Sequence, residues 1–256
     1  MGFLVDVHAD SNVEVTLVLP AYNESERIEQ AVSKAINELK TIASSYEVII
    51  AEDGSTDGTD SIANRLTHVF DSVIHLHSDK RLGRGEALKR AFKESHGQIL
   101  SFIDVDMSTD IKHLKLLIEA ISDGFDFSTG SRMHPESTVS RTWMRQLLSQ
   151  TYNAFIRLLF KTGISDHQCG FKAFKKTSLL EIIDDVEDNH WFWDTEILVL
   201  GIRKGYKIKE IPITWTAGKG TKVKLLSDSS KMAFKAILLW WKLRDCPIIH
   251  GVLTSS

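Results

Sequence analysis

The sequence predicts an α/β fold in which helices flank a mostly parallel sheet, because short apolar runs alternate with segments of helical periodicity. Four runs are rich in β-branched and aromatic residues, as buried strands are, and they cover residues 13–19, 46–51, 73–76 and 98–104. Segments with apolar residues at helical spacing separate them, at 28–39, 57–69 and 85–92. This alternation is typical of βαβ units, whose strands run parallel.

Turn and cap residues set the expected boundaries of these elements. Pro20 stops the first strand, and Asn23 with Glu26 three residues later resembles a capping box, which predicts that the first helix begins there. Gly83 and Gly85 open the third helix. Ligands of parallel sheets bind beyond the carboxyl ends of the strands, so the residues that follow each strand are the first candidates for a site.

The pattern changes after Gly130, where helices become more frequent than strands. One further segment, at 207–215, is typical of a strand, and Pro212 in it indicates an edge position. A short segment at 170–174 precedes the next helices. Apolar stripes at helical spacing predict helices at 144–159, near Leu179, near Ile197 and at 230–243.

Length and composition fit one folded domain. The chain has 256 residues, of which 43% are hydrophobic, and this is enough to bury a full core. Neither an internal repeat nor a low-complexity tract divides it. The expected organisation is a leader at 1–12, a single domain at 13–244 and a tail at 245–256.

Charge and cysteine content restrict the environment and the partners. The net charge of −3 argues against nucleic-acid binding, which favours a strongly basic surface. Cys169 and Cys246 lie far apart in the sequence and form neither a disulfide framework nor a zinc spacing, which is typical of a reducing cytosol. Neither a signal peptide nor an apolar run of roughly 18 residues is present. We therefore expect a protein in solution or at a membrane surface.

Asp104-Val-Asp106 is the strongest candidate for a metal site. The motif follows the buried strand at 98–104, and carboxylates two residues apart at a strand end can point to one side of the chain. Carboxylate oxygens are the ligands that a hard divalent cation prefers, with open positions left for phosphates. For an isolated motif of this kind, two solvated acids at the start of a turn would be the simpler interpretation.

Two loops near this motif could bind a nucleotide. Gly83-Arg84-Gly85 lies at a helix start, where backbone N–H groups and the helix dipole favour a phosphate and Arg84 adds a charge. Asp53 follows the second strand and could accept a hydrogen bond from a base N–H. A plain turn is the alternative for both loops.

Other polar residues allow a functional and a structural interpretation. His75 and His77 alternate onto one face of a strand and could chelate a metal, but no third ligand is near in sequence, so ordinary strand positions are favoured. Asp194 and Glu196 could support acid–base chemistry, or could only stabilise the dipole of the helix that they begin.

Taken together, these motifs resemble glycosyltransferase family 2, the inverting enzymes of the GT-A type. The nucleotide-sugar motifs occur in order as Pro20-Ala-Tyr-Asn-Glu24, Glu52-Asp-Gly-Ser-Thr-Asp57, Gly83-Arg-Gly85 and Asp104-Val-Asp106. The later motifs resemble those of dolichyl-phosphate glucosyl- and mannosyltransferases: Gly130-Ser-Arg132, the segment 166–174, Trp193-Asp-Thr-Glu196 and the segment 210–215. The resemblance covers residues 13 to about 244.

The resemblance implies a role for each matching residue. The nucleoside site would comprise Pro20, Ala21, Tyr22, Glu24 and Asp53. Arg84 would approach the diphosphate, and Asp104 with Asp106 would hold Mg²⁺ or Mn²⁺ and contact the sugar. The acceptor phosphate would be met by Arg132, Arg145 and Lys222. Asp194 would position the acceptor or give modest help as a base.

The function that the resemblance implies is transfer of a hexose from a UDP-sugar to a polyisoprenyl (dolichyl) phosphate, with glucose favoured. Met107-Ser-Thr follows the metal motif where mannosyl enzymes tend to have Leu-Gln, which weakens the alternative of a GDP-mannose donor. Glu52 replaces the usual first Asp of Asp-Asp-Gly-Ser, a mild change. A sugar nucleotidyltransferase and a non-catalytic nucleotide-sugar-binding module are weaker alternatives.

A lipid acceptor requires access to a membrane. The stripes at 144–159 and 234–241, flanked by Arg and Lys, suit helices that lie at the surface of a bilayer. They could equally face the protein core or a second copy of the chain in a homo-oligomer. The membrane interpretation predicts a cytoplasmic protein held at the cytosolic face of a membrane.

Overall fold

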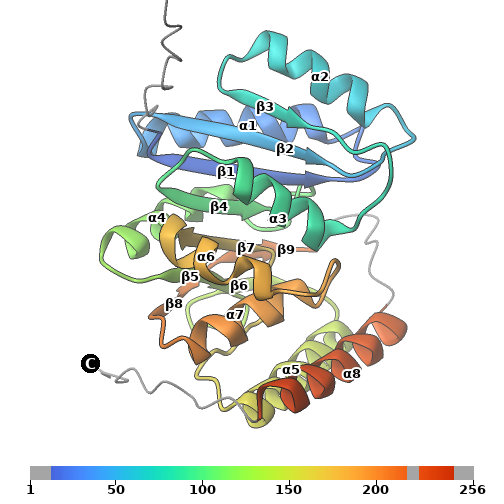
Figure 1. Cartoon of the computed structure of the whole chain (residues 1–256), viewed down its shortest axis with the longest axis vertical. Coiled ribbons are helices and arrows are strands. Elements are labelled where there is room, and N and C mark those ends of the chain that lie inside the picture. Colours follow the sequence, from blue (N-terminus) through green and yellow to red (C-terminus); the bar gives the residue numbers. More distant parts are fainter. Residues whose placement is uncertain (1–12, 218–224, 245–256) are drawn as a thin grey trace, which may run out of the picture.

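The computed structural model describes residues 13–217 and 225–244. The expected leader and tail, and Lys222 of the expected acceptor site, lie outside these residues. A central sheet with helices on both faces forms the body of the molecule, and a pair of long helices lies at one end of it (Figure 1).

The central sheet has seven strands in the order β3-β2-β1-β4-β7-β5-β8. Their bounds are Val15–Ala21 (β1), Tyr46–Glu52 (β2), Val73–Leu76 (β3), Ile99–Ile103 (β4), Phe127–Ser131 (β5), Phe171–Lys175 (β7) and Ile208–Pro212 (β8). Strands β1 to β4 are mutually parallel, and β5 is parallel to β8, but β7 runs antiparallel to both of its neighbours. The α/β class and the mostly parallel sheet are therefore confirmed.

Three helices cover each face of the sheet. On each face the helices and strands share one apolar cluster, and the two clusters are separate. One face packs against α1 (Ile28–Ile42), α2 (Thr59–Val69) and α4 (Leu114–Ser122). The other packs against α3 (Arg84–Glu94), α6 (Lys176–Ile182) and α7 (Trp193–Arg203). Two short 3₁₀ turns adjoin these helices, Ile111–His113 directly before α4 and Ile183–Asp185 directly after α6.

Helices α5 (Trp143–Phe160) and α8 (Leu225–Leu243) lie side by side beyond the sheet (Figure 1). A third apolar cluster joins them to α7, and it contains Tyr152, Ile156, Phe192, Val199, Met232, Ala236 and Leu239. The cluster buries only one side of each helix. Both helices expected from the apolar stripes are therefore present, with part of their apolar surface in a protein core.

The first helix begins later than the sequence predicts. Asn23 does not cap it: the residue has a positive φ of 51°, and its side-chain oxygen accepts a hydrogen bond from the backbone N–H of Thr56 at 2.9 Å. The backbone N–H of Glu24 donates to the Thr59 hydroxyl at 2.8 Å. These long-range bonds fix the turn after β1 against the loop after β2, so regular helix starts only at Ile28.

The strand expected at 207–215 is two strands in two sheets. Strand β8 ends at Pro212 on the edge of the large sheet, as expected for an edge proline, and β9 (Thr214–Thr216) pairs with β6 (Thr138–Ser140) instead. Between them, the Ile213 backbone N–H donates to the Ser137 hydroxyl at 2.9 Å. This bond turns the chain out of the large sheet, which sequence periodicity does not indicate.

Candidate active site

A cavity of about 340 Å³ lies at the carboxyl ends of the central strands. Its walls come from the ends of β1, β2 and β4, from the start of α3, and from α5, α7 and α8. The lining includes every described residue of the expected site, namely Pro20, Ala21, Tyr22, Glu24, Asp53, Arg84, Asp104, Asp106, Arg132, Arg145 and Asp194. Side chains that lie far apart in the sequence thus meet in one hollow.

Asp104 and Asp106 form the acidic end of this cavity. Strand β4 ends one residue before Asp104, and a positive φ of 48° at Met107 turns the chain sharply after the pair. The Asp104 side chain is 40% exposed, toward the cavity, and Asp106 is exposed with one oxygen accepting from the Ser108 backbone N–H at 3.0 Å. Burial by the surrounding protein raises the pKa of Asp104, and the charge of Arg84 opposes this shift.

Arg84 connects the acidic end to α7. The first residue of α3, it donates from Nε to Asp104 at 2.9 Å and from Nη1 to Asp194 at 2.7 Å. Burial opposes the charge of the guanidinium, but the two carboxylates outweigh this effect and raise its pKa. Arg84 is therefore held rigidly in the cavity wall by partners from two different elements.

Asp194 is enclosed between two cations. Its side chain is 5% exposed, and its second oxygen lies 3.1 Å from Nζ of Lys172, which is fully buried on β7. Both carboxylate oxygens of Asp194 are therefore occupied by cationic partners. This geometry suits the positioning of Arg84 better than the abstraction of a proton.

The glycine loop does not use its backbone N–H groups as the sequence suggests. The Leu82 and Gly83 N–H groups donate to Asp53 at 2.6 and 2.9 Å, and the Gly85 N–H donates to the Asn189 carbonyl at 2.8 Å. The expectation that the two glycine N–H groups cradle a phosphate is therefore wrong. A Cβ on Gly83 would overlap the Asn189 carbonyl oxygen, so that glycine is required for close packing against the loop before α7.

The cavity wall around Tyr22 contains a cation that sequence reasoning missed. The guanidinium of Arg81 lies 3.9 Å from the centre of the Tyr22 ring, a cation–π contact on the cavity wall. Glu24, on the same wall, pairs with Arg27 at 3.0 Å. Arg81 comes just before the glycine loop, which the sequence predicts to bind phosphate. This position was the signal that could have indicated a role for Arg81.

A second group of cavity-lining residues is cationic, namely Arg132, Arg141 and Arg145, and we call it the cationic end. Arg132 forms a bidentate pair with Asp166, at 2.7 Å from Nε and 2.9 Å from Nη2. Burial would raise the pKa of Asp166, but the adjacent Arg132 charge lowers it below the usual range. Arg145, on α5, also lines this end. Arg132 is thus fixed in place by its carboxylate partner.

Arg141 is a second residue that sequence reasoning did not assign to the site. It lines the cavity just before α5, and its Nε is buried without a hydrogen-bond partner in the part of the chain that the structure describes. Burial, and then the neighbouring charge of Arg132, lowers its pKa. A buried, unpaired N–H is costly, and an anion in the cavity would satisfy it.

The fold and this cavity define a class of protein. A sheet of this topology, with a paired-aspartate turn at the end of its fourth strand, is the GT-A-like arrangement of glycosyltransferases. Residues 16–183 match the sequence profile of Glycosyl transferase family 2, and the chain belongs to that family.

Two curated relatives show which members of the family the chain is similar to. The chain is 44% identical over 247 residues to the glycosyltransferase AglD of Haloferax volcanii, and the aligned region covers 95% of this chain and 40% of AglD. It is 31% identical over 250 residues to the dolichyl-phosphate beta-glucosyltransferase of Saccharomyces cerevisiae, covering 90% of this chain and 75% of the yeast protein. The chain therefore spans less than half the length of AglD and about three quarters of the yeast enzyme.

Solved structures have the same fold. Glucosyl-3-phosphoglycerate synthase from Mycobacterium tuberculosis, in complex with Mn²⁺, UDP-glucose and phosphoglyceric acid, superposes with a TM-score of 0.68 at 18% identity, over 91% of this chain and 82% of that one. A mannosyltransferase from Pyrobaculum calidifontis, in complex with GDP-Man and Mn²⁺, gives 0.62 at 20% identity, over 93% and 66%. These similarities establish the fold.

The helices can be compared with the length and apolarity that a membrane-spanning helix needs. None of the helices in residues 13–217 and 225–244 is long and apolar enough to cross a membrane.

Proposed function

We propose that this protein transfers a hexose, with glucose favoured, from a UDP-sugar to a polyisoprenyl phosphate and inverts the anomeric carbon. The observation that carries this proposal is the single cavity whose lining contains both the Asp104–Asp106 pair and the arginines Arg132, Arg141 and Arg145. The similarity to yeast dolichyl-phosphate beta-glucosyltransferase supports the choice of sugar and acceptor. We assign the activity to residues 13–244, taken as one domain.

The acidic end suits a metal-bound diphosphate. Asp106 is exposed, Asp104 faces the cavity, and carboxylate oxygens of this kind fit Mg²⁺ or Mn²⁺. Such an ion, held by these two residues, would act as a Lewis acid that stabilises the charge on the departing nucleoside diphosphate. Tyr22, Asp53 and Arg81 line the adjoining wall, where we place the nucleoside.

The cationic end suits the acceptor phosphate. Arg132 is fixed by Asp166, and Arg141 offers a buried N–H without a partner among the described residues. The forked guanidinium matches the geometry of phosphate oxygens, so we assign Arg132, Arg141 and Arg145 to this group, with Lys222 as a further contact. The acceptor would then lie on the side of the sugar opposite the leaving diphosphate, as inversion requires.

Proton abstraction contributes little in this mechanism. A phosphate monoester has a second pKa of about 6 and is largely ionised at neutral pH, so its oxygen is already a nucleophile. Asp194 is occupied by Arg84 and Lys172. We therefore assign Asp194 the role of positioning Arg84 beside the diphosphate.

The exposed apolar side chains of α5 and α8 suit contact with the membrane that carries the acceptor. Trp143 is 73% exposed and Leu158 82%, and α8 adds Phe234, Leu238 and Trp241. Arg145, on the same helix as Trp143, lines the cationic end of the cavity. A lipid that enters between these helices and the bilayer would present its phosphate to that end, and we propose that the protein lies at the cytosolic face of a membrane.

A substrate panel tests the proposed function. The protein is incubated with Mn²⁺ or Mg²⁺, a short polyprenyl phosphate, and UDP-glucose, GDP-mannose or UDP-N-acetylglucosamine, and lipid products are separated from released nucleotide. We expect glucosylated lipid and one UDP per transfer. Lipid product from GDP-mannose alone would overturn the donor assignment, and absence of lipid product with every donor would overturn the acceptor.

A further inference from the structure

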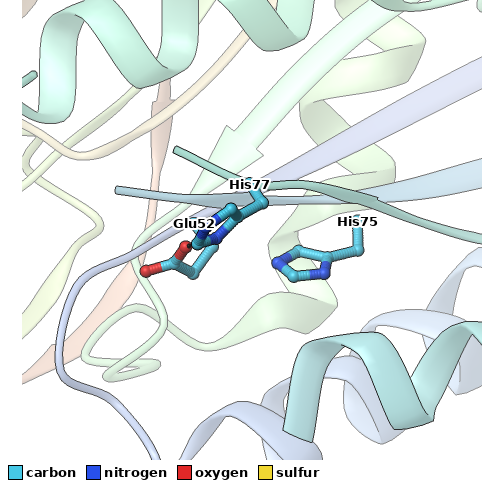
Figure 2. Close-up of side chains that lie close together, drawn as sticks. All are labelled: Glu52, His75 and His77. Atoms are coloured by element: carbon cyan, nitrogen blue, oxygen red, sulfur yellow. Dashed lines mark hydrogen bonds and ion pairs between the residues drawn. The ribbon is translucent and has the colours of Figure 1, made fainter. Parts of the chain in front are cut away.

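Three potential metal ligands meet outside the cavity, at the carboxyl ends of β2 and β3. Glu52 is the last residue of β2, His75 lies on β3, and His77 follows that strand. The parallel register places Ala51 opposite Leu76, so Glu52 comes beside His77 and on the same face as His75. One ligand atom from each residue lies within 4.8 Å of the others, and Figure 2 shows the three side chains gathered together.

Two of the three residues already form a pair. Glu52 is buried, and one of its oxygens accepts from the Ser55 backbone N–H. The other lies 2.6 Å from Nδ1 of His77. A structural role in fastening the loop after β2 would explain this pair without any metal.

His75 is not explained by that structural role. Its Nε2 is buried and has no hydrogen-bond partner within the described residues. Figure 2 shows its ring beside Glu52 and His77, with an edge turned toward them. A buried imidazole nitrogen without a partner costs free energy, and a cation shared with Glu52 and His77 would remove that cost.

We propose that Glu52, His75 and His77 bind a transition-metal ion of the zinc class. Two imidazoles and one carboxylate are typical ligands of Zn²⁺, whereas Mg²⁺ and Mn²⁺ prefer oxygen ligands such as the aspartate pair in the cavity. Tetrahedral ligands about 2.0 Å from Zn²⁺ lie about 3.3 Å apart, so His77 must move slightly from its 2.6 Å contact with Glu52. His77 is 44% exposed, which leaves room for this small movement, and the ion replaces the proton shared by the pair.

The site has a structural role in the loop that reaches the cavity. Glu52, His75 and His77 do not line the cavity, but Asp53, the next residue after Glu52, does. A bound ion would join β2, β3 and the loop through Ser55 into one rigid unit. Asp79, exposed and 3.2 Å from Nε2 of His77, would orient the imidazole from its far side, and a water molecule could complete the coordination.

The test measures metal binding to chelator-stripped full-length protein. Zn²⁺ is titrated against a chromophoric chelator with excess Mg²⁺ present, and Co²⁺ absorption reports the ligand geometry. We expect one tight equivalent in the wild type and in Asp106→Asn. Since loss of a supporting group alone costs about tenfold in affinity, His75→Ala and His77→Ala should weaken binding by at least about tenfold. His68→Ala, which removes an exposed histidine of α2, is the matched control and should bind as the wild type does.

Two results would overturn the proposal. One is equal affinity in the wild type, His75→Ala and His77→Ala, which would assign the zinc to other surface groups. The other is loss of binding in Asp106→Asn with retention in the histidine variants, which would place the ion at the aspartate pair. If circular dichroism shows that His75→Ala does not fold, the exposed His77→Ala variant tests the proposal alone. Zn²⁺ should then raise the melting temperature of the wild type but not of His77→Ala.

Discussion

The two ends of the cavity differ in how far their charges are already paired. At the acidic end, Arg84 is held by Asp104 and Asp194, and Lys172 completes a continuous ionic network. At the cationic end Arg132 has a carboxylate partner, but the Nε of Arg141 has none within the described residues. The first end is built to hold its geometry before any substrate arrives, whereas the second gains a hydrogen bond when an anion arrives.

The largest effect is expected at the acidic end. Asp106→Asn removes a charged metal ligand, and Lewis-acid stabilisation is worth several kcal/mol, so turnover should fall by about a thousandfold or more. Rates of hexose transfer at saturating Mn²⁺ measure this. Asp123→Asn, at an exposed acid that does not line the cavity, should keep the wild-type rate. Near-normal turnover in Asp106→Asn with an intact fold would refute the role of the metal.

A smaller and more selective loss is expected at the cationic end. Arg141→Gln removes a charged donor, and charged hydrogen bonds are worth about 1.5–3 kcal/mol, so kcat/KM for the acceptor should fall by about ten- to a hundredfold. The KM for the UDP-sugar should stay unchanged. Arg65→Gln, an exposed arginine of α2, serves as the control. An increase in donor KM instead of acceptor KM would reverse the assignment of the two ends.

The next effect is expected on membrane binding, at the exposed surface of α5 and α8. Leu158→Ser removes apolar area that we place in the bilayer, and a leucine is worth about 1.5–3 kcal/mol when buried, so vesicle binding should weaken about tenfold. Flotation with anionic liposomes measures this. Leu116→Ser on α4, also exposed, should have no effect. If Leu158→Ser instead changes the sedimentation coefficient and leaves flotation intact, the surface contacts a second copy of the chain.

A last effect, on stability rather than on activity, concerns the attachment of α5 to the loop that carries Asp166. His167 lies in that loop, is buried, and bonds Asn153 of α5 at 2.9 Å, and burial lowers its pKa to about 3. As the pH falls below about 6.5, the unfolded chain takes up a proton at His167 and the folded chain does not. The free energy of unfolding therefore decreases as the pH falls. The slope from this group is about 1.4 kcal/mol per pH unit between pH 6 and 4.

Denaturant unfolding at pH 7, 6, 5 and 4 measures that slope. His167→Gln has no titrating group, so its stability should depend less on pH by the same amount. Equal slopes in the wild type and the variant would show that His167 is protonated in the folded protein and that the loop is attached to α5 in another way.

Local patterns predicted the first half of the molecule well. Strands β1 to β4 and the helices between them follow from periodicity, and the position of Asp53 and Asp104 after their strands follows from the parallel arrangement. Asn23 shows the limit, because its bond to Thr56 spans more than thirty residues and overrides a favourable cap pattern.

Contacts between distant segments could not be predicted in this way. Antiparallel β7 enters between β4 and β5, and a Cβ on Gly170, just before it, would overlap a carboxylate oxygen of Asp104. Glu52 meets His77 only because of the register of β2 and β3. Arg141 precedes the apolar stripe at 144–159, and the sequence does not show that the chain before α5 turns into the cavity.

The anomeric configuration of the lipid product tests the arrangement of the cavity most directly. With the diphosphate at the acidic end and the acceptor phosphate at the arginine end, attack on α-linked UDP-glucose must come from the face opposite the leaving group. The proton NMR coupling of the anomeric hydrogen should therefore show a β-linked glucosyl lipid. An α-linked product would contradict the placement of donor and acceptor at opposite ends of one cavity.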